Sequence, residues 1–205
     1  MTQLRLTKIV CVGRNYVEHA KELGNEVPKE PLLFLKPPSS VIGDKQPIRL
    51  PAASKQVEFE GEIGIIVGER LTNASEELAR EAVLAIAAVN DVTARDLQRS
   101  DSQWTRAKGF DTFCPVGVPG APPNDLGSLE VLTRVNGVER QRGKASQMAF
   151  SIPMLLAYIS RIMTLEPGDL VCTGTPAGVG TLQPGDVVEV EVLGVSRVTN
   201  SVVAP

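Results

Sequence analysis

Residues 58–67 read EFEGEIGIIV, a run that ends in the apolar residues of a buried strand but begins with three glutamates. If the segment is extended, alternate side chains share a face, so Glu58, Glu60 and Glu62 project from the same side. Such neighbours lie about 7 Å apart and repel by about 0.6 kcal/mol in water and about 2.4 kcal/mol at an effective dielectric constant near 20. A wet surface tolerates this repulsion, whereas a cleft requires a cation, a basic partner or a proton.

Short apolar runs separated by Gly and Pro turns recur on both sides of this segment. They predict strands over 7–12, 31–36, 57–67, 113–118, 129–136, 169–173 and 186–203. The last run contains a strict alternation, VVEVEV, and a turn near Leu193 and Gly194. Residues 37–56, rich in Pro and Ser, are expected to form a loop between strands.

Helices are predicted in few places. The clearest covers 73–89, where Asn73 and Glu76 suggest a capping box and apolar residues recur at helical spacing at Leu78, Ala82, Val83 and Ile86. A second is predicted near 151–163, and a short third over 15–24, closed by Gly24. Because helices do not regularly separate the strands, the pattern predicts a strand-rich α+β fold, organised as a single domain over 1–205.

Composition narrows the possible partners. A net charge of −3 without a basic cluster argues against nucleic acid or an anionic membrane as the main partner and favours a small-molecule substrate. Since the N-terminus has no apolar leader and no segment reaches 18 consecutive apolar residues, we expect a cytoplasmic protein. The three cysteines, Cys11, Cys114 and Cys172, stand far apart in apolar runs and are interpreted as small core residues.

A further acid, Asp91, follows an apolar run in AAVNDVTARDLQ. Two carboxylates from the acidic strand together with Asp91 would suit Mg²⁺ or Mn²⁺, which prefer oxygen ligands. Spacing alone does not choose among Glu58, Glu60 and Glu62. The alternative is a solvated edge face and an unrelated aspartate.

Other side chains could carry chemistry. If 15–24 is helical, the single histidine, His19, lies on the same face as Glu22, an arrangement suited to a general base with an orienting carboxylate, although an exposed surface pair is the alternative. The run GDLVCTGTPAGVG lacks nucleotide-binding spacing, but Thr173, Gly174 and Thr175 could hold a carboxylate. Lys108 could pair with an anion or lie on the surface.

Seven motifs, taken in order, resemble the fumarylacetoacetate hydrolase family, and most closely its short branch of acylpyruvases and oxaloacetate decarboxylases. They are KIVCVGRNYVEHAKE, PLLFLKP, FEGEIGIIVG, NDVTARDLQ, WTRAKGFDTFCPVG, SIPMLLAYIS and GDLVCTGTPAGVG. The resemblance runs from about residue 7 to the C-terminus. It implies a mixed β-sandwich roll with a few short helices, usually assembled as a homodimer.

The resemblance also implies a site. The family's metal ligands fall on Glu60, Glu62 and Asp91, leaving Glu58 outside, and its H-x-x-E dyad falls on His19 and Glu22. Gln98 and Lys108 match its substrate-facing glutamine and lysine, and Arg14, Thr173, Gly174 and Thr175 are the implied substrate contacts. One departure is the segment RSDSQWTRA before Lys108, which is shorter than in animal acylpyruvases and carries Arg106 where they have an apolar residue.

The resemblance implies hydrolysis of an acylpyruvate-type 2,4-dioxo acid with Mg²⁺ or Mn²⁺. The metal would chelate the 2-oxo acid and stabilise the pyruvate enolate that leaves when the C3–C4 bond breaks. Water would be activated by His19, while Lys108 and Gln98 would position the far carbonyl. Decarboxylation of oxaloacetate, isomerisation or hydration of an unsaturated 2-oxo diacid, and a non-catalytic metal-binding module are the alternatives.

Overall fold

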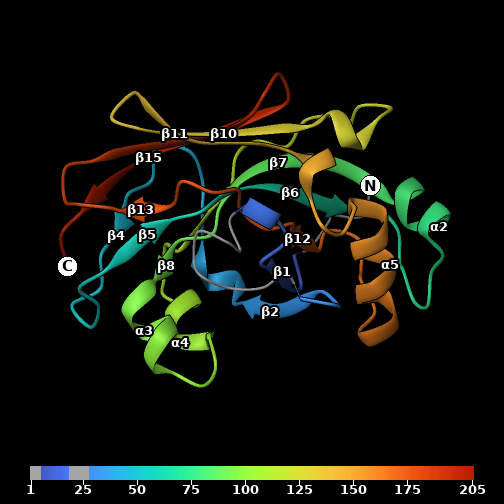
Figure 1. Cartoon of the computed structure of the whole chain (residues 1–205), viewed down its shortest axis with the longest axis horizontal. Helices are drawn as coiled ribbons and strands as arrows, with labels where there is room; N and C mark the ends of the chain where they lie inside the picture. The colour runs from blue at the N-terminus through green and yellow to red at the C-terminus, as the bar shows by residue number, and fades with distance from the viewer. Residues whose placement is uncertain (1–5, 19–27) are drawn as a thin grey trace.

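The computed structural model describes residues 6–18 and 28–205 and is dominated by strands (Figure 1). The α-helices in these residues are short except the last: α2 (Glu76–Glu81), α3 (Arg95–Ser100), α4 (Thr105–Lys108) and α5 (Ile152–Ile162). The strands are β1 (Ile9–Gly13), β2 (Leu32–Lys36), β3 (Val41–Ile42), β4 (Ile48–Arg49), β5 (Val57–Phe59), β6 (Gly61–Val67), β7 (Val83–Asn90), β8 (Thr93–Ala94), β9 (Cys114–Pro115), β10 (Glu130–Val135), β11 (Val138–Lys144), β12 (Leu170–Cys172), β13 (Gly180–Thr181), β14 (Val187–Val192) and β15 (Ser196–Val203). The α+β prediction is therefore confirmed.

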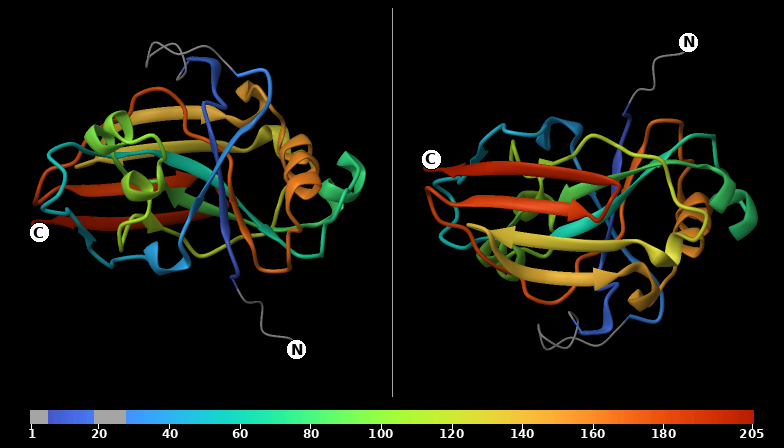
Figure 2. Two further views of the ribbon diagram at one scale, coloured as in Figure 1. Left: turned by 90° about the horizontal axis from the view of Figure 1, so that it is seen from below. Right: turned by 90° about the horizontal axis from the view of Figure 1, so that it is seen from above.

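Two five-stranded sheets form the body of the fold. The first has the order β2-β1-β12-β6-β7 and is mixed, because β1 and β12 run parallel while the other pairs are antiparallel. The second has the order β11-β10-β14-β15-β4. Figure 2 shows the long strands of the second sheet side by side, and contacts of β6 and β7 with β10, β14 and β15 place the two sheets face to face.

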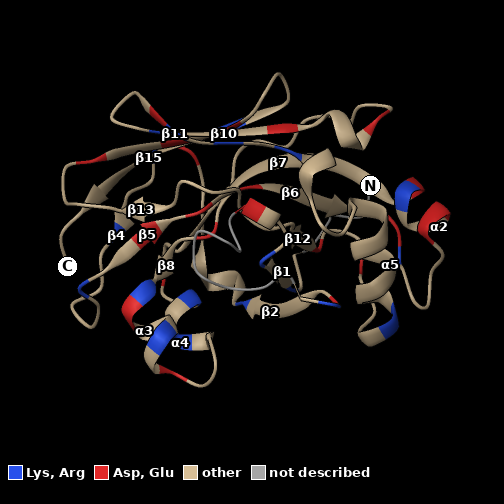
Figure 3. Cartoon of the chain, in the orientation of Figure 1, with Lys and Arg blue, Asp and Glu red and all other residues tan. Residues whose placement is uncertain are grey.

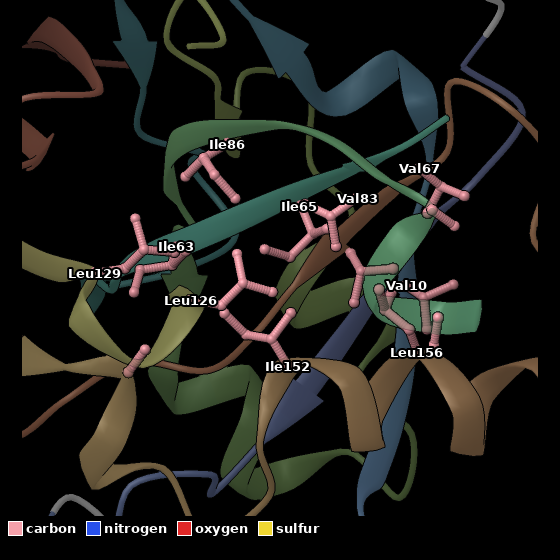
Figure 4. Close-up of a cluster of buried hydrophobic side chains, with 14 of the residues drawn as sticks. Val10, Ile63, Ile65, Val67, Val83, Ile86, Leu126, Leu129, Ile152 and Leu156 are labelled. Atoms are coloured by element: carbon pink, nitrogen blue, oxygen red, sulfur yellow. The ribbon is translucent and has the colours of Figure 1, made fainter. Parts of the chain in front are cut away.

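The main hydrophobic core lies between these sheets and extends under α5. Ile63 and Ile65 of β6, Val131 of β10 and Val190 of β14 are fully or almost fully buried in one cluster with Leu156 of α5. Figure 4 shows Ile63 and Ile65 of β6 in the same cluster of side chains as Ile152 and Leu156 of α5. This core holds β6 rigidly, and β6 begins within the acidic segment 58–62.

The predicted helix over 73–89 is wrong for most of its length. Only Glu76–Glu81 is helical, Ser75 rather than Asn73 caps it by accepting from the Leu78 N–H, and Val83–Asn90 is strand β7. The run VLAIAAV is apolar at every position, so apolar residues necessarily occur at helical spacing within it whether or not it is a helix. Pairing along the whole of β6 and burial on both faces decide in favour of the strand.

Other boundaries differ less. The strand predicted over 57–67 is two strands with a break at Glu60, and only Cys114–Pro115 of 113–118 is a strand. The helix near 151–163 is confirmed as α5, with Ser151 as its N-cap, and the hairpin within 186–203 is confirmed as β14 and β15. Most of the helix predicted over 15–24 lies outside the described residues.

The three cysteines are buried, as expected of core residues. Cys11, Cys114 and Cys172 are unbridged and lie in one cluster with Ile9, Val89 and other apolar side chains. Burial raises the pKa of the Cys11 thiol to about 11, so this sulfur stays protonated at neutral pH. Within the described part of the chain, the helices are all too short or too polar to cross a bilayer.

Asp169 ties the beginning of β1 to the turn before β12. Its buried carboxylate accepts from the N–H groups of Thr7 and Lys8, from the Thr7 hydroxyl and from the Glu166 N–H, and it pairs with the Lys8 ammonium. Burial alone would raise the pKa of Asp169, but these donors outweigh it and hold the pKa below its ordinary value.

We expect Asp169→Asn to lower the free energy of unfolding by about 2 kcal/mol at neutral pH, because an amide cannot accept all of these hydrogen bonds. A carboxyl whose pKa is depressed on folding stabilises above its unfolded pKa, about 3.9, and that contribution disappears as the pH falls through the folded value. The difference between the two proteins should therefore shrink below about pH 4. Denaturant unfolding from pH 7 to pH 3 measures it. The control is Glu166→Gln, whose partner Arg70 is exposed, and an equal effect of both variants would contradict the assignment.

Candidate active site

Three acidic side chains meet where β5, β6 and β7 end or begin. Glu60 lies in the break between β5 and β6, Glu62 is the second residue of β6, and Asp91 directly follows β7. The Asp91 N–H donates to the Glu60 carbonyl at 2.8 Å, which locks the two strand ends together. One carboxylate oxygen from each residue lies within 4.8 Å of the others. We call Glu60, Glu62 and Asp91 the acidic triad.

Gly61, between the two glutamates, allows this close approach. A Cβ at this position would lie 1.9 Å from the Thr133 hydroxyl oxygen of the second sheet, so any larger residue would have to displace the Thr133 side chain. The Gly61 N–H donates to Gln141 Oε1 of β11, and its carbonyl accepts from the Thr175 hydroxyl. The EGE sequence is therefore a consequence of packing as well as of chemistry.

Buried cations surround the triad. Lys108 Nζ donates to Glu60 Oε2 at 2.8 Å and to Asp91 Oδ2 at 2.6 Å, and Lys36 Nζ donates to Asp91 Oδ1 at 2.6 Å. Arg95 links Glu58, which is not a member of the triad, to Glu60, which is. Its Nε donates to Glu58 Oε2 at 2.7 Å and its Nη2 to Glu60 Oε1 at 2.5 Å. Figure 3 shows the acidic positions of β5 and the basic positions of α3 and α4.

The charges of this buried group do not cancel. Among residues 6–18 and 28–205, four buried carboxylates (Glu58, Glu60, Glu62, Asp91) face three buried cations (Lys36, Arg95, Lys108), so the acids outnumber the bases by one in this part of the chain. Burial raises the pKa of Glu62, and the charges of Asp91 and Glu60 raise it further, against the opposing effects of Lys108 and the Gly174 N–H. The pKa of Glu62 is thus raised well above its ordinary value, which favours the protonated form of this side chain.

Lys108 behaves in the opposite way. Burial alone would lower its pKa, but the neighbouring charges of Asp91 and Glu60 more than offset this and raise the pKa above its ordinary value. The ammonium is therefore charged at neutral pH and provides a fixed positive centre beside the triad. It also lies 4.9 Å from the centroid of the Phe34 ring, a favourable contact between a cation and an aromatic face.

The triad forms one side of a cleft of about 280 Å³. Its other lining residues come from the end of β1, from β2, α3 and α4, and from the turn after β12. They are Val12, Gly13, Arg14, Phe34, Arg95, Gln98, Arg99, Trp104, Lys108 and Thr175. This cleft has the dimensions of a small-molecule site, with charged groups at one end and aromatic rings beside them.

The structure brings together most of the residues that the sequence singled out. Gln98, on α3, lines the cleft and its Oε1 accepts from Arg95 Nη1 at 2.5 Å. Arg14 also lines the cleft, with a left-handed backbone conformation (φ 60°). His19 and Glu22 lie outside the described residues. Glu58 is buried on Arg95 and stands apart from the triad.

The turn after β12 is used to hold the triad in place. The Gly174 N–H donates to Glu62 Oε2 at 2.8 Å, while the hydroxyls of Thr173 and Thr175 donate to the carbonyls of Ile63 and Gly61. The carboxylate that this turn binds here is thus that of Glu62. Contacts of Thr173, Gly174 and Thr175 with a substrate remain a prediction.

Two residues of the site, Lys36 and Arg95, were not predicted from the sequence. Lys36 ends the apolar run PLLFLK and is 1% exposed, and a single lysine in a strand of this kind is a signal of a buried charge partner. Arg95 lies four residues after Asp91 in NDVTARDLQ and is 3% exposed. Nothing in its spacing indicates that it would return to Glu58 and Glu60.

The donor set fits a hard divalent cation. It offers three buried carboxylates whose oxygens converge, and burial together with the charges of Asp91 and Glu60 raises the pKa of one of them, Glu62. Mg²⁺ and Mn²⁺ prefer such oxygen ligands, and no sulfur or imidazole group is part of this cluster of described residues. A divalent cation at this point would compete with a proton for the Glu62 carboxylate and would offset the mutual repulsion of the three carboxylates.

We therefore expect metal affinity to increase with pH. Because the pKa of Glu62 is raised in the metal-free protein, binding must displace a proton at low pH, and the apparent affinity should rise as the pH increases through that raised value. Calorimetry with Mn²⁺ in buffers of different ionisation enthalpy measures the proton release. Binding that releases no proton and has equal affinity at pH 5 and pH 8 would contradict this competition.

Comparisons with known proteins support the same family throughout the chain. A family model described as Fumarylacetoacetate (FAA) hydrolase C-terminal matches residues 8–203. The mitochondrial oxaloacetate decarboxylase of Dictyostelium discoideum is 44% identical over 194 residues, which cover 91% of this chain and 89% of the relative.

Solved structures show the same fold. The 5-carboxymethyl-2-hydroxymuconate delta-isomerase of Mycobacterium smegmatis is 44% identical, with a TM-score of 0.90 over 98% of this chain and 80% of the other. The fumarylpyruvate hydrolase of Pseudomonas aeruginosa, solved in complex with Mn²⁺ and pyruvate, is 29% identical, with a TM-score of 0.92 over 100% of this chain and 93% of the other. The names of these three relatives describe three different reactions.

Proposed function

Since this chain belongs to the fumarylacetoacetate hydrolase family, we propose that it is a divalent-metal-dependent hydrolase. It would cleave the carbon–carbon bond of an acylpyruvate-type 2,4-dioxo acid. The observation that carries the proposal is the acidic triad, three buried carboxylates converging at the side of a cleft next to a charged lysine. The Pseudomonas fumarylpyruvate hydrolase was solved with Mn²⁺ and pyruvate, which are what an enzyme of this kind would bind.

Glu60, Glu62 and Asp91 would hold Mg²⁺ or Mn²⁺ in this proposal. When bound, the cation supplies Lewis-acid chemistry by polarising the oxygens of a 2-oxo acid and stabilising the negative charge that develops as the bond breaks. The surrounding residues keep the triad in position. Gly174 fixes one oxygen of Glu62 through its N–H, and Arg95 fixes one oxygen of Glu60.

The remaining groups act on the far part of the substrate. Lys108 is charged at neutral pH and almost fully buried, a setting in which it can stabilise an oxyanion on the acyl carbonyl more strongly than in water. Gln98 lines the cleft with its amide anchored through Oε1 to Arg95, so its N–H groups remain to orient that carbonyl. Arg14, also at the cleft, is the proposed partner for a substrate carboxylate.

His19 is the proposed general base. Oriented by Glu22, it would take a proton from the attacking water, a step that hydrolysis requires. No other imidazole of the same chain could fill this role, because the chain contains a single histidine. Decarboxylation would need no such proton transfer from water.

Decarboxylation of oxaloacetate is the second candidate, favoured by the relative from Dictyostelium, and isomerisation of an unsaturated 2-oxo diacid is the third, favoured by the structure from Mycobacterium. Turnover assays with acylpyruvates, oxaloacetate and unsaturated 2-oxo diacids, each with Mg²⁺ and Mn²⁺, separate them. The proposal requires the highest kcat/KM for an acylpyruvate. Metal binding without turnover of any 2-oxo acid would instead identify a non-catalytic metal-binding module.

The proposal includes the setting of the enzyme. We propose a cytoplasmic homodimer built of one catalytic domain per chain, which acts on a small-molecule 2-oxo acid and has neither nucleic acid nor a membrane as partner. Light scattering after size-exclusion chromatography tests the dimer, and a monomer at micromolar concentration would exclude it.

A further inference from the structure

The wall of the cleft beyond Lys108 is aromatic. The edge of one ring meets the face of the other between Phe34 and Trp104, with centroids 5.3 Å apart and planes at 72°. Phe34 lies under the Lys108 ammonium, which in turn bonds two members of the acidic triad. Two side chains, Lys108 and Phe34, therefore connect the triad to the indole, and Trp104 lines the same cleft as the triad.

The indole rests directly on the backbone of Gly13, the last residue of β1. A Cβ on Gly13 would lie 3.0 Å from Cζ3 and 3.2 Å from Cη2 of Trp104. The backbone of Gly13 does not adopt the left-handed conformation that favours glycine. The absence of a side chain on Gly13 thus leaves space for the tryptophan, whereas the backbone conformation does not call for glycine.

Trp104 is also fixed to the charged end of the cleft through the backbone. It is the N-cap of the single-turn helix α4, and its carbonyl accepts from the Lys108 N–H at 2.9 Å. Trp104, whose ring closes the aromatic wall, and Lys108, beside the triad, therefore belong to one helical turn. A rigid wall at a set distance from an anchoring point limits how long a bound molecule can be.

We propose that Trp104, seated on Gly13, is the specificity-determining residue that sets the longest acyl chain that the cleft accepts. The inference rests on the proposed function, since it takes the acidic triad as the anchor of a 2-oxo acid. The substrate class is then a short-chain 2-oxo acid whose tail is apolar where it meets the indole. Chains that reach past the indole are excluded.

The test uses two variants that shift the wall in opposite directions and one conservative variant. Trp104→Ala removes the wall, while Gly13→Ala places a methyl group against Cζ3 and Cη2 and pushes the indole into the cleft. Trp104→Phe retains a smaller ring. The ligands are saturated linear 2-oxo acids of increasing length, starting from pyruvate, measured by calorimetry with Mn²⁺ present and expressed relative to pyruvate for each protein.

In the wild-type protein each added methylene should tighten binding about fourfold, the equivalent of about 0.8 kcal/mol, until the chain meets the indole. The first methylene that does not fit should weaken binding by roughly 10- to 200-fold. The chain length at which binding first weakens, called the break, should shift to longer acids in Trp104→Ala and to shorter acids in Gly13→Ala. In Trp104→Phe the break should lie between those of the wild type and Trp104→Ala. Because Trp104 is the only tryptophan of the chain, wild-type fluorescence should change only with acids that reach the ring.

A break at the same chain length in wild type and Gly13→Ala would overturn the proposal, and so would an unchanged break in Trp104→Ala. If Trp104→Ala does not fold, the shift to shorter acids in Gly13→Ala alone decides. If pyruvate binds but chain length has no effect, only the role of Trp104 fails. If no 2-oxo acid binds to the wild-type protein with Mn²⁺, the proposed function fails together with it.

Discussion

Replacing Glu62 with glutamine is expected to lower kcat/KM for every 2-oxo acid substrate by about three orders of magnitude or more. The change removes one charged oxygen donor from the acidic triad while keeping the shape of the side chain and an oxygen that can accept from the Gly174 N–H. A polarising cation contributes several kcal/mol of charge stabilisation, and about 1.4 kcal/mol corresponds to a factor of ten in rate. Steady-state kinetics at saturating Mg²⁺ or Mn²⁺ provide the measurement.

The matched control is Glu58→Gln, because Glu58 belongs to the same acidic segment, 58–62, as Glu62. Glu58 bonds Arg95 and Gln56 and is not part of the triad, so this variant should lose less than about tenfold in kcat/KM. The stability of Glu62→Gln without metal should equal or exceed that of the wild type, because a neutral amide replaces a carboxyl group whose charged form is disfavoured by burial and by the neighbouring acids. Equal losses of activity in the two variants would remove the distinction between Glu58 and the triad.

The second large effect is expected from His19→Ala, which should separate two candidate reactions. Hydrolysis of an acylpyruvate needs a base to take a proton from water, and losing a positioned base typically costs about 10² to 10⁴ in rate. Decarboxylation of oxaloacetate needs only chelation and an oriented leaving carboxylate, so its rate should fall much less. The measurement is kcat/KM for both substrates in wild type and variant, with the fold checked by circular dichroism.

Glu22→Gln complements this comparison, since it leaves the imidazole in place and removes only the charge proposed to orient it. It should reduce hydrolysis less than His19→Ala does and shift the pH profile of hydrolysis to a lower apparent pKa. If His19→Ala slows both reactions to the same extent, water activation is not its role. A general role in binding any ligand would then explain the loss.

The sequence correctly predicts strands whose polar and apolar residues alternate. It fails where the choice between helix and strand depends on residues far away in the sequence. The alternation VVEVEV predicts β14 correctly, since one face of it is packed and the other is wet. Residues 83–90 carry no such alternation because β7 is buried on both faces over most of its length, with Ile86 and Ala88 in the main core and Ala87 and Val89 in the cluster that contains the cysteines. An apolar run of this kind is compatible with helix or strand until its partner is known.

The site shows the same division. The alternation in EFEGEIG indicates that its charges must be balanced, and the family resemblance selects Glu60 and Glu62 over Glu58. The structure confirms that Glu60, Glu62 and Asp91 converge. Local sequence could not predict how the balance is achieved, because Lys36, Arg95 and Lys108 come from separate elements and only the fold brings them together. Two lysines and an arginine from these elements surround the acids, and burial raises the pKa of Glu62.

The most direct test of the account is a crystal structure of the protein grown with Mn²⁺, with diffraction data collected to locate the anomalous signal of the metal. The account predicts one strong anomalous peak in coordination contact with carboxylate oxygens of Glu60, Glu62 and Asp91, and the loss of that peak in crystals of Glu62→Gln. A peak on Glu58, or the absence of any peak at the triad in crystals saturated with Mn²⁺, would contradict it.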